Sequence, residues 1–295
     1  MSTPNFSILI TTKNRKNDLT FTLEKIKHLI DRNDVECMIC DDGSTDDTAN
    51  YIQTQYPEIN FIQNSKSKGL IYSRNRMMAM VKSEFAISID DDLHFITQNP
   101  LEIISKFFSD TPSAAVLSFR IFWSKSEPTS TESTENAMLM QSYAGGANVF
   151  RMTAWRDIPN YPEWFVFYGE ENFASYHLFK KHWEIYYLPD ALVHHRVEIK
   201  ARSIENKDFG IRYRRSIRAG WYGYFLFYPL VKIPRAMGYS LWMQFKTKIL
   251  KGNFKVIVPV CQALLDLMIY MPTCIKNRNA LTRLEYEKYQ KLNPT

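Results

Sequence analysis

The feature that most constrains this chain is the stretch Phe85–Asp92, in which a short apolar run ends in three consecutive aspartates. The run is typical of a buried strand, whereas three adjacent carboxylates repel one another and cannot be buried without cationic partners. A divalent metal is the simplest partner, because Asp is a hard oxygen ligand suited to Mg²⁺ or Mn²⁺. The stretch therefore predicts a strand that brings a metal, and with it a phosphorylated substrate, to the carboxyl edge of a sheet. A solvated acidic turn is the alternative.

Strand and helix patterns alternate along the first part of the chain. Apolar, β-branched runs precede the one at Asp90, at residues 6–12, 35–40 and 59–62. Apolar side chains recur at helical spacing between these runs, in segments 19–30, 51–56 and 70–81. Because strands alternate with helices, we expect an α/β fold with a doubly wound, mixed but mainly parallel sheet and a C-terminal helical region.

Composition narrows the class of protein and its compartment. The formal net charge of +6 and the pI of about 9.0 are compatible with binding to nucleic acid, to an anionic membrane or to an anionic substrate.

Cys37 and Cys40 are three apart on a predicted strand, so they point to opposite faces and suit neither a disulfide nor a shared zinc. No signal-peptide pattern opens the chain, and no run of about 18 uninterrupted apolar residues occurs. We expect a cytoplasmic protein, peripheral on the inner face of the plasma membrane.

A second acidic strand end, Asp41–Asp42, suggests a nucleotide site. Ligands of doubly wound sheets bind outside the carboxyl ends of the strands, so the two acidic ends should share one cleft. Asp42 would accept hydrogen bonds from a base, Asp90 from ribose, and Asp92 would bind the metal. Arg74 offers bidentate donors to the nucleotide, although a structural salt bridge explains it equally well.

Four segments, in this order, resemble the family 2 glycosyltransferases with a GT-A fold: Ser7–Arg15, Cys40–Asp46, Gly69 with Arg74–Asn75, and Asp90–Asp92. The resemblance implies an inverting transfer from a nucleoside diphosphate sugar, with Mn²⁺ or Mg²⁺ at Asp92. It also implies nucleotide contacts, which we place at Thr11, Arg15, Asp41, Asp42, Arg74, Asp90 and Asp91.

An inverting transfer needs a base that deprotonates the acceptor hydroxyl. The family usually supplies it as the Asp of a Glu-Asp pair, whereas this chain has Glu170–Glu171. We expect Glu171 to be the base and Glu170 its neighbour, because adjacent carboxylates raise one pKa toward a useful value. A glutamate at the start of a helix is the structural alternative.

Three further positions complete the expected site. Gly145–Gly146 resembles the family's turn beside the donor sugar, where a side chain would obstruct close approach, although a plain tight turn fits too. We expect Trp164 to contact the donor or acceptor sugar. The family often places a histidine late in the domain as a metal ligand, and of His194 and His195 we favour His195; strand parity decides which points inward.

We expect two parts, a catalytic domain at residues 1–203 and a basic, aromatic helical region at 204–295. Segments 203–243 and 246–276 are typical of a membrane-surface element, and a helical cap or a homodimer contact remains the alternative. The acceptor would be a glycan or a lipid-linked molecule.

The leading function is therefore a hexosyl- or deoxyhexosyltransferase in surface polysaccharide synthesis. A sugar-nucleotide nucleotidyltransferase is the nearest rival, but those enzymes resemble one another in a glycine-rich loop after the first strand, and Thr11–Arg15 contains no glycine. A non-catalytic basic membrane adaptor would leave both acidic strand ends unexplained. We expect no nucleic acid partner, because these ends would repel its phosphates.

Overall fold

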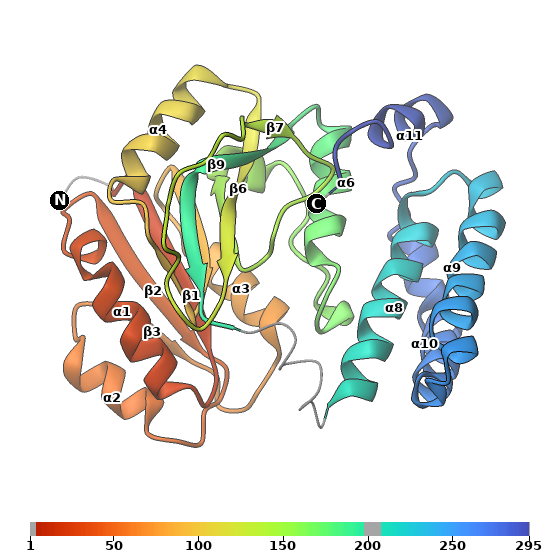
Figure 1. Cartoon of the computed structure of the whole chain (residues 1–295), viewed down its shortest axis with the longest axis horizontal. Coiled ribbons are helices and arrows are strands. Elements are labelled where there is room, and N and C mark those ends of the chain that lie inside the picture. The colour runs from red at the N-terminus through yellow and green to blue at the C-terminus, as the bar shows by residue number, and fades with distance from the viewer. Residues whose placement is uncertain (1–3, 198–207, 295) are drawn as a thin grey trace.

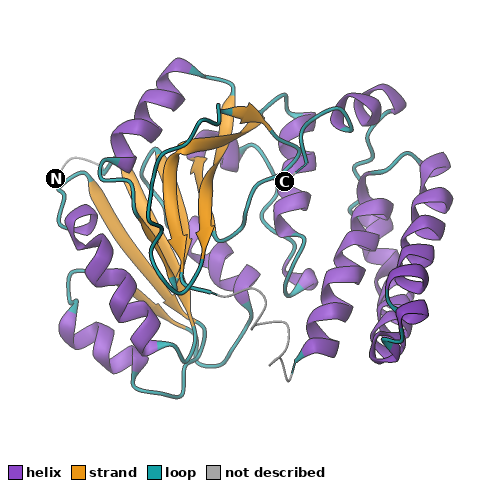
Figure 2. Cartoon of the chain, in the orientation of Figure 1, coloured by secondary structure: helices purple, strands orange, loops and turns teal. Residues whose placement is uncertain are grey.

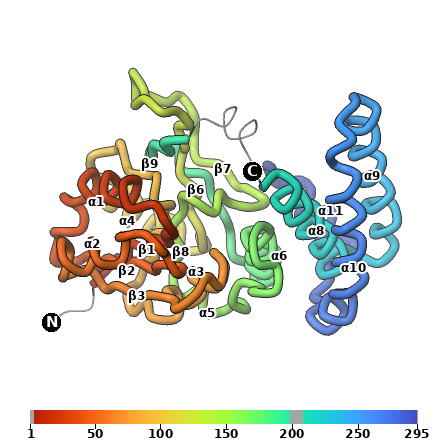
Figure 3. Tube along the Cα trace, turned by 90° about the horizontal axis from the view of Figure 1, so that it is seen from below, coloured from red at the N-terminus to blue at the C-terminus, as the bar shows by residue number. Residues whose placement is uncertain are grey.

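The computed structural model describes residues 4–197 and 208–294, which form a mixed α/β fold with a helical region at one end (Figures 1 and 2). Figure 3 shows that the helices at the end of the chain lie beside the sheet-containing body and do not cover it. This arrangement confirms the fold class expected from the sequence. The expected domain boundary at 203/204 lies outside the described residues.

One sheet of nine strands forms the centre of the body. Its strands are β1 (Phe6–Thr12), β2 (Val35–Asp41), β3 (Asn60–Gln63), β4 (Phe85–Asp90), β5 (Leu93–Phe95), β6 (Ala114–Trp123), β7 (Met138–Leu139), β8 (Ala147–Arg151) and β9 (Glu184–His195). Their order is β3-β2-β1-β4-β8-β6-β9-β5, with β7 beside β9. The first four strands of that order run parallel, and β8 runs antiparallel to both of its neighbours. The carboxyl ends of β1, β2 and β4 therefore meet at one edge of the sheet.

Helices cover both faces of the sheet. The α-helices of the body are α1 (Lys16–Ile30), α2 (Thr48–Gln55), α3 (Leu70–Met78), α4 (Pro100–Asp110), α5 (Met152–Arg156) and α6 (Glu170–Lys180). Buried residues of α1, α2 and α4 pack in one apolar cluster, and those of α3, α5 and α6 pack in another. Cys37 belongs to the first cluster and Cys40 to the second, so the two thiols lie on opposite faces, as the strand parity predicts.

β9 is a single long strand that contains a proline, Pro189. Phe119 of β6 pairs with Leu188, whereas the next residue, Arg120, pairs with Leu192. The three residues between them, Pro189–Ala191, form a bulge that lets the strand continue through a proline. Beyond the bulge the side chains alternate again, which sets the direction of the two histidines at the strand's end.

The helical region contains α8 (Phe209–Phe227), α9 (Ile233–Thr247), α10 (Ile257–Lys276) and α11 (Arg283–Tyr289). Pro259 and Asp266 interrupt the apolar sequence of α10, yet the helix is continuous through both. Pro259 lies in the first turn, where backbone N–H groups lack helical acceptors and a proline is tolerated. The last helix, α11, begins at a capping box of Thr282 and Glu285.

Asp266 attaches α10 to α8. Its buried carboxylate accepts hydrogen bonds from Arg214 Nε at 2.6 Å and Arg218 Nη1 at 3.1 Å. Arg218 also donates to the Phe165 carbonyl at 2.7 Å, which connects both helices to the body. Burial opposes ionisation of Asp266, but the two arginines outweigh it and hold its pKa below the usual range.

We expect Asp266→Ala to lower the free energy of unfolding by about 3 kcal/mol, because it leaves the buried Arg218 without its carboxylate partner. Urea unfolding measures this change. Asp190→Ala, at an exposed aspartate without an ion pair to a described residue, serves as the matched control. Equal stability of the two variants would contradict the role of Asp266.

Candidate active site

A cavity of about 370 Å³ opens at the carboxyl edge of the sheet. Four carboxylates from two strand ends line it: Asp42, Asp90, Asp91 and Asp92. The start of α8 forms part of the opposite wall. The two acidic strand ends therefore meet in one cleft, as the sequence predicts.

Asp90, Asp92 and His195 form a group that can hold a metal ion, because one ligand atom from each lies within 4.8 Å of the others. His195 Nε2 lies 2.9 Å from Asp92 Oδ1, yet that buried oxygen has no aligned hydrogen bond with any residue that the structure describes. Arg15 Nη2 lies 2.7 Å from the other oxygen, Oδ2. Burial opposes ionisation of Asp92, but His195 and Arg15 hold its pKa well below the usual range. Two carboxylates and an imidazole are a donor set suited to Mn²⁺.

His194 points away from this group and belongs to another. It pairs with His94 across β5 and β9, and with Glu127 these residues could surround a cation. Arg196 Nη1, however, lies 2.9 Å from His94 Nδ1, and Lys25 Nζ lies 2.7 Å from Glu127 Oε1. Two cationic side chains already contact the potential ligands, so we assign no metal there.

Asp91 is buried between Thr12 and Arg15. Thr12 Oγ1 donates to its carboxylate at 2.8 Å, and Arg15 Nη1 lies 3.0 Å from the other oxygen. Burial raises the pKa of Asp91 to about 7, with the Asp92 charge adding to the shift and Arg15 opposing it. Thr11 also lines the cavity, and its buried hydroxyl has no partner among the described residues. A ligand could therefore use the Thr11 hydroxyl.

Asp42 lines the cavity and also organises the loop before α3. Its carboxylate accepts hydrogen bonds from Ser67 Oγ at 2.6 Å, Lys68 N at 2.7 Å and Gly69 N at 3.0 Å. Burial opposes ionisation, but these bonds outweigh it and keep the pKa of Asp42 below the usual range. Gly69 adopts φ +98°, a left-handed conformation that favours glycine. If Asp42 contacts a base as expected, it must do so through carboxylate oxygens that already accept hydrogen bonds from this loop.

Asp41 and Arg74 do not line the cavity, contrary to the expectation that both contact the nucleotide. Asp41 is fully buried, and its carboxylate accepts from Ser44 N at 3.0 Å and Gln63 Nε2 at 3.2 Å. Asp41 therefore stabilises the segment after β2, because it connects Ser44 to Gln63 at the end of β3.

Arg74 is a buried connection between two parts of the site. Its Nη2 lies 3.3 Å from Asp90 Oδ1, and its Nη1 lies 3.0 Å from Glu170 Oε1 and 4.0 Å from Glu171 Oε1. The structural salt bridge left open as an alternative is the observed arrangement. It positions the end of β4 against the start of α6.

The two glutamates at the start of α6 differ in exposure. The Glu170 side chain is 2% exposed and bonds to Arg74, whereas that of Glu171 is 22% exposed. Burial raises the pKa of both carboxyls, and for Glu171 the neighbouring Glu170 charge adds to the shift. Glu171 is therefore the more accessible of the two and can accept a proton.

Gly145 and Gly146 lie where two carboxylates approach the backbone. A Cβ on Gly145 would lie 1.9 Å from Glu171 Oε1, and one on Gly146 would lie 2.3 Å from Asp90 Oδ2. Such distances are far below van der Waals contact, so a side chain at either position would displace the neighbouring carboxylate. In this structure the protein's own carboxylates approach the glycine turn, and the expected approach of a donor sugar stays a prediction.

Trp164 does not line the cavity. Its ring stacks on Tyr270 of α10 with centroids 5.6 Å apart and also packs against Tyr222 of α8. The expected sugar contact of Trp164 stays a prediction. Phe167 lines the cavity instead.

Sequence reasoning missed three cations in the cavity wall: Lys13, Arg212 and Arg215. Within residues 4–197 and 208–294 none of them forms an ion pair. Arg212 and Arg215 are three apart on a helix and therefore share a face. Their spacing in the sequence could have indicated a shared basic face beside the cavity. We interpreted the basic helix next to aromatic residues as a membrane surface instead.

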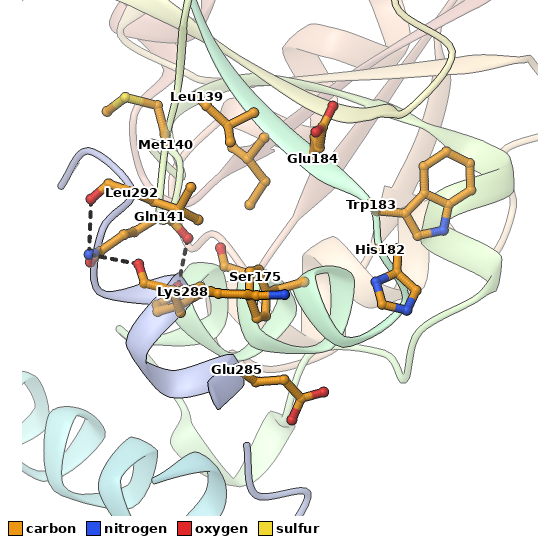
Figure 4. Close-up of a pocket in the computed structure, with 13 residues that line it drawn as sticks. Leu139, Met140, Gln141, Ser175, His182, Trp183, Glu184, Glu285, Lys288 and Leu292 are labelled. Atoms are coloured by element: carbon orange, nitrogen blue, oxygen red, sulfur yellow. Dashed lines mark hydrogen bonds between the residues drawn. The ribbon is translucent and has the colours of Figure 1, made fainter. Parts of the chain in front are cut away.

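A second cavity, of about 280 Å³, lies between α6, β9 and α11 and is drawn in Figure 4. The Gln141 amide donates to the carbonyls of Tyr289 and Leu292, and Tyr289 Oη donates back to the Gln141 carbonyl. These bonds hold the end of the chain against the body. The walls contain no cluster of carboxylates among the described residues, so we assign no chemistry to this cavity.

The chain matches the model of Glycosyl transferase family 2 over residues 7–179, more than half of its length, and therefore belongs to that family. A search of the curated proteins found no sequence relative.

Solved structures of glycosyltransferases share the fold at low sequence identity. GalNAc-T7 with UDP, GalNAc and Mn²⁺ has a TM-score of 0.59 at 14% identity, and the match covers 78% of this chain and 49% of that one. TarS 1–349 of S. aureus with UDP-GlcNAc has a TM-score of 0.58 at 17% identity and covers 97% and 92%. The mannosyltransferase PcManGT of Pyrobaculum calidifontis with GDP-Man and Mn²⁺ has a TM-score of 0.55 at 12% identity and covers 98% and 84%. This chain thus spans about half the length of GalNAc-T7, and these likenesses establish the GT-A fold.

We expect His195→Ala to weaken Mn²⁺ binding at least about tenfold, because it removes one of three ligand-capable groups. Titration with Mn²⁺ followed by electron paramagnetic resonance measures the affinity. His194→Ala is the matched control, since the adjacent imidazole belongs to the other group. If His194→Ala weakens Mn²⁺ binding as much as His195→Ala does, the assignment of His195 is wrong.

Proposed function

We propose that this family 2 glycosyltransferase transfers a sugar from a nucleoside diphosphate sugar to an acceptor hydroxyl, with inversion at the anomeric carbon. The observation that carries the proposal is the shared cavity of Asp42, Asp90 and Asp92, with Glu171 next to Asp90 across the Gly145–Gly146 turn. The similar solved structures contain UDP, UDP-GlcNAc or GDP-Man, which supports a donor of this class.

In this proposal each wall of the cavity binds one part of the donor. Thr11, whose hydroxyl has no partner among the described residues, and Asp42 contact the base, and Asp90 accepts from the ribose. Lys13, Arg212 and Arg215 offer positive charge to the diphosphate. Asp92, His195 and Asp90 would hold Mn²⁺ or Mg²⁺, which when bound supplies charge that stabilises the departing diphosphate.

Glu171 acts as the base in the transfer step. Its carboxylate takes the proton of the acceptor hydroxyl while that oxygen bonds to the anomeric carbon, and the bond from this carbon to the diphosphate oxygen breaks. Attack opposite the leaving group inverts the configuration. Arg74 positions the base relative to the donor, because it joins Asp90 on the nucleotide side to Glu170, the neighbour of Glu171.

The finer features of the function are also part of the proposal. The transferred sugar is a hexose or deoxyhexose, and the acceptor is a glycan or lipid-linked molecule in surface polysaccharide synthesis. The protein works in the cytoplasm at the inner face of the plasma membrane. The basic composition of the helical region supports this location.

Nucleoside diphosphates should raise the melting temperature of the protein in the presence of Mn²⁺, because a ligand that binds only the folded state stabilises it. A screen of the diphosphates by thermal shift, with and without Mn²⁺, identifies the base. We expect the shift to require metal and to be absent in Asp92→Ala. Metal-independent stabilisation of Asp92→Ala would contradict the proposed site.

Glu171→Gln should lower kcat by about 10²–10⁴-fold and leave donor binding intact, because it removes only the proton acceptor. In the unchanged protein, kcat/KM should fall as pH decreases through the raised pKa of Glu171, above the value near 4.3 of an ordinary glutamate. Glu58→Gln, at an exposed glutamate, is the control for both measurements. A Glu171→Gln enzyme of normal kcat would exclude Glu171 as the base.

A further inference from the structure

We propose that the helical hairpin made of α9, the turn 248–256 and α10 docks on the surface of an anionic lipid bilayer. This binding goes beyond the proposed transfer reaction, because it requires neither donor nor acceptor. Below, "the hairpin" means residues 233–276.

The outer face of α10 has the wrong polarity for contact with water. Five apolar side chains on it are between 53% and 70% exposed: Val258, Leu265, Met268, Ile269 and Ile275. They recur at helical spacing, whereas the acidic residue of the helix, Asp266, is buried against α8. A surface helix of a soluble protein shows the reverse arrangement, with its apolar face turned inward. The outer face of α10 therefore requires an apolar partner.

The outer face of α9 carries aromatic side chains. Tyr239, Trp242 and Phe245 are 64%, 52% and 42% exposed and follow one another at intervals of three. Tyr and Trp are favoured at the boundary between lipid and water, because one part of each ring system is apolar and the other can hydrogen-bond. Arg235 and Lys246 lie near the two ends of this aromatic face. This pattern matches a helix that lies in a membrane interface.

The turn between the helices combines both kinds of contact. Leu250 and Phe254 are each 64% exposed, next to the exposed Lys248, Lys251 and Lys255. From Leu230 to Lys276 the chain contains seven Lys and Arg residues and one acidic residue, Asp266, which the arginines of α8 neutralise. A protein partner would have to match this charge as well as the apolar faces, and an anionic bilayer does both.

The hairpin lies on the membrane in this proposal and does not cross it. The segment Phe254–Lys276 is long and apolar enough to span a bilayer by length and composition, and its most apolar window of 18 residues has a mean hydropathy of 1.7. Asp266, however, would then lie within the apolar core, and its bonds to Arg214 and Arg218 hold α10 along α8 instead. Only 28% of the most apolar window is buried in the protein, so most of it remains available to lipid.

The turn lies at the same end of α8 as the cavity. A Cβ on Gly210 would lie 3.6 Å from Pro259, and two residues later on α8 Arg212 enters the cavity wall. A bilayer under the turn would therefore lie on the cavity side of the molecule. That this docking would bring the cavity close to a lipid-linked acceptor rests on the proposed function. The docking of the hairpin on a bilayer does not.

Vesicle sedimentation tests the docking directly with the full-length protein. We expect binding to phosphatidylcholine vesicles that contain about 30% phosphatidylglycerol and at least about tenfold weaker binding to vesicles of phosphatidylcholine alone. Leu265→Ser/Ile269→Ser should lose binding at least about tenfold, and so should Lys248→Glu/Lys251→Glu/Lys255→Glu. Absence of binding to the anionic vesicles would overturn the proposal.

Matched variants separate the hairpin from the rest of the surface. Met80→Ser/Leu284→Ser and Lys66→Glu/Lys82→Glu/Lys291→Glu change exposed side chains outside the hairpin and should bind vesicles normally. Equal losses in these controls would refute a hairpin-specific surface, as would membrane binding that resists alkaline extraction, which indicates a spanning helix. If Leu265→Ser/Ile269→Ser instead dissociates a dimer in solution and leaves vesicle binding unchanged, the surface is a contact between two copies. The melting-temperature shift with nucleotide, measured in the same variants, tests the proposed function separately.

Discussion

A buried arginine between carboxylates holds the two working parts of this molecule together. Arg74 lies between Asp90, at the end of a central strand, and Glu170, at the start of the helix that carries Glu171. A charge inside a protein is tolerated only when it is paired, so these elements must meet in one arrangement or leave a buried charge alone. The glycine turn at Gly145–Gly146 depends on the same arrangement, because both carboxylates occupy the space that side chains would need.

The sequence predicted the sheet edge well because the physics there is local. Apolar runs that end in aspartates identify parallel strands and the edge at which their ends meet, and Asp42 and Asp92 do line one cavity. Strand parity also predicts that His194 and His195 point to opposite faces, and in the structure each belongs to a different group of potential metal ligands.

Sequence reasoning does not supply surroundings that come from distant segments. Nothing near Trp164 in sequence indicates that Tyr222 and Tyr270 pack against its ring. Pro259 is tolerated because it lies at the start of a helix, which the apolar pattern alone does not locate. From the sequence, Arg212 and Arg215 suggested a membrane surface. Their place in the cavity wall follows only from the folded chain. Each case needs tertiary contacts that composition and periodicity do not contain.

The bulge at Pro189–Ala191 determines where this strand can change in length. Three unpaired residues there separate two well-paired stretches of β9, so an insertion or deletion inside the bulge leaves the register on either side intact. The same change made after Leu192 would shift the parity of the strand's end and exchange the places of the two imidazoles. Natural length variation in this strand should therefore be confined to the bulge.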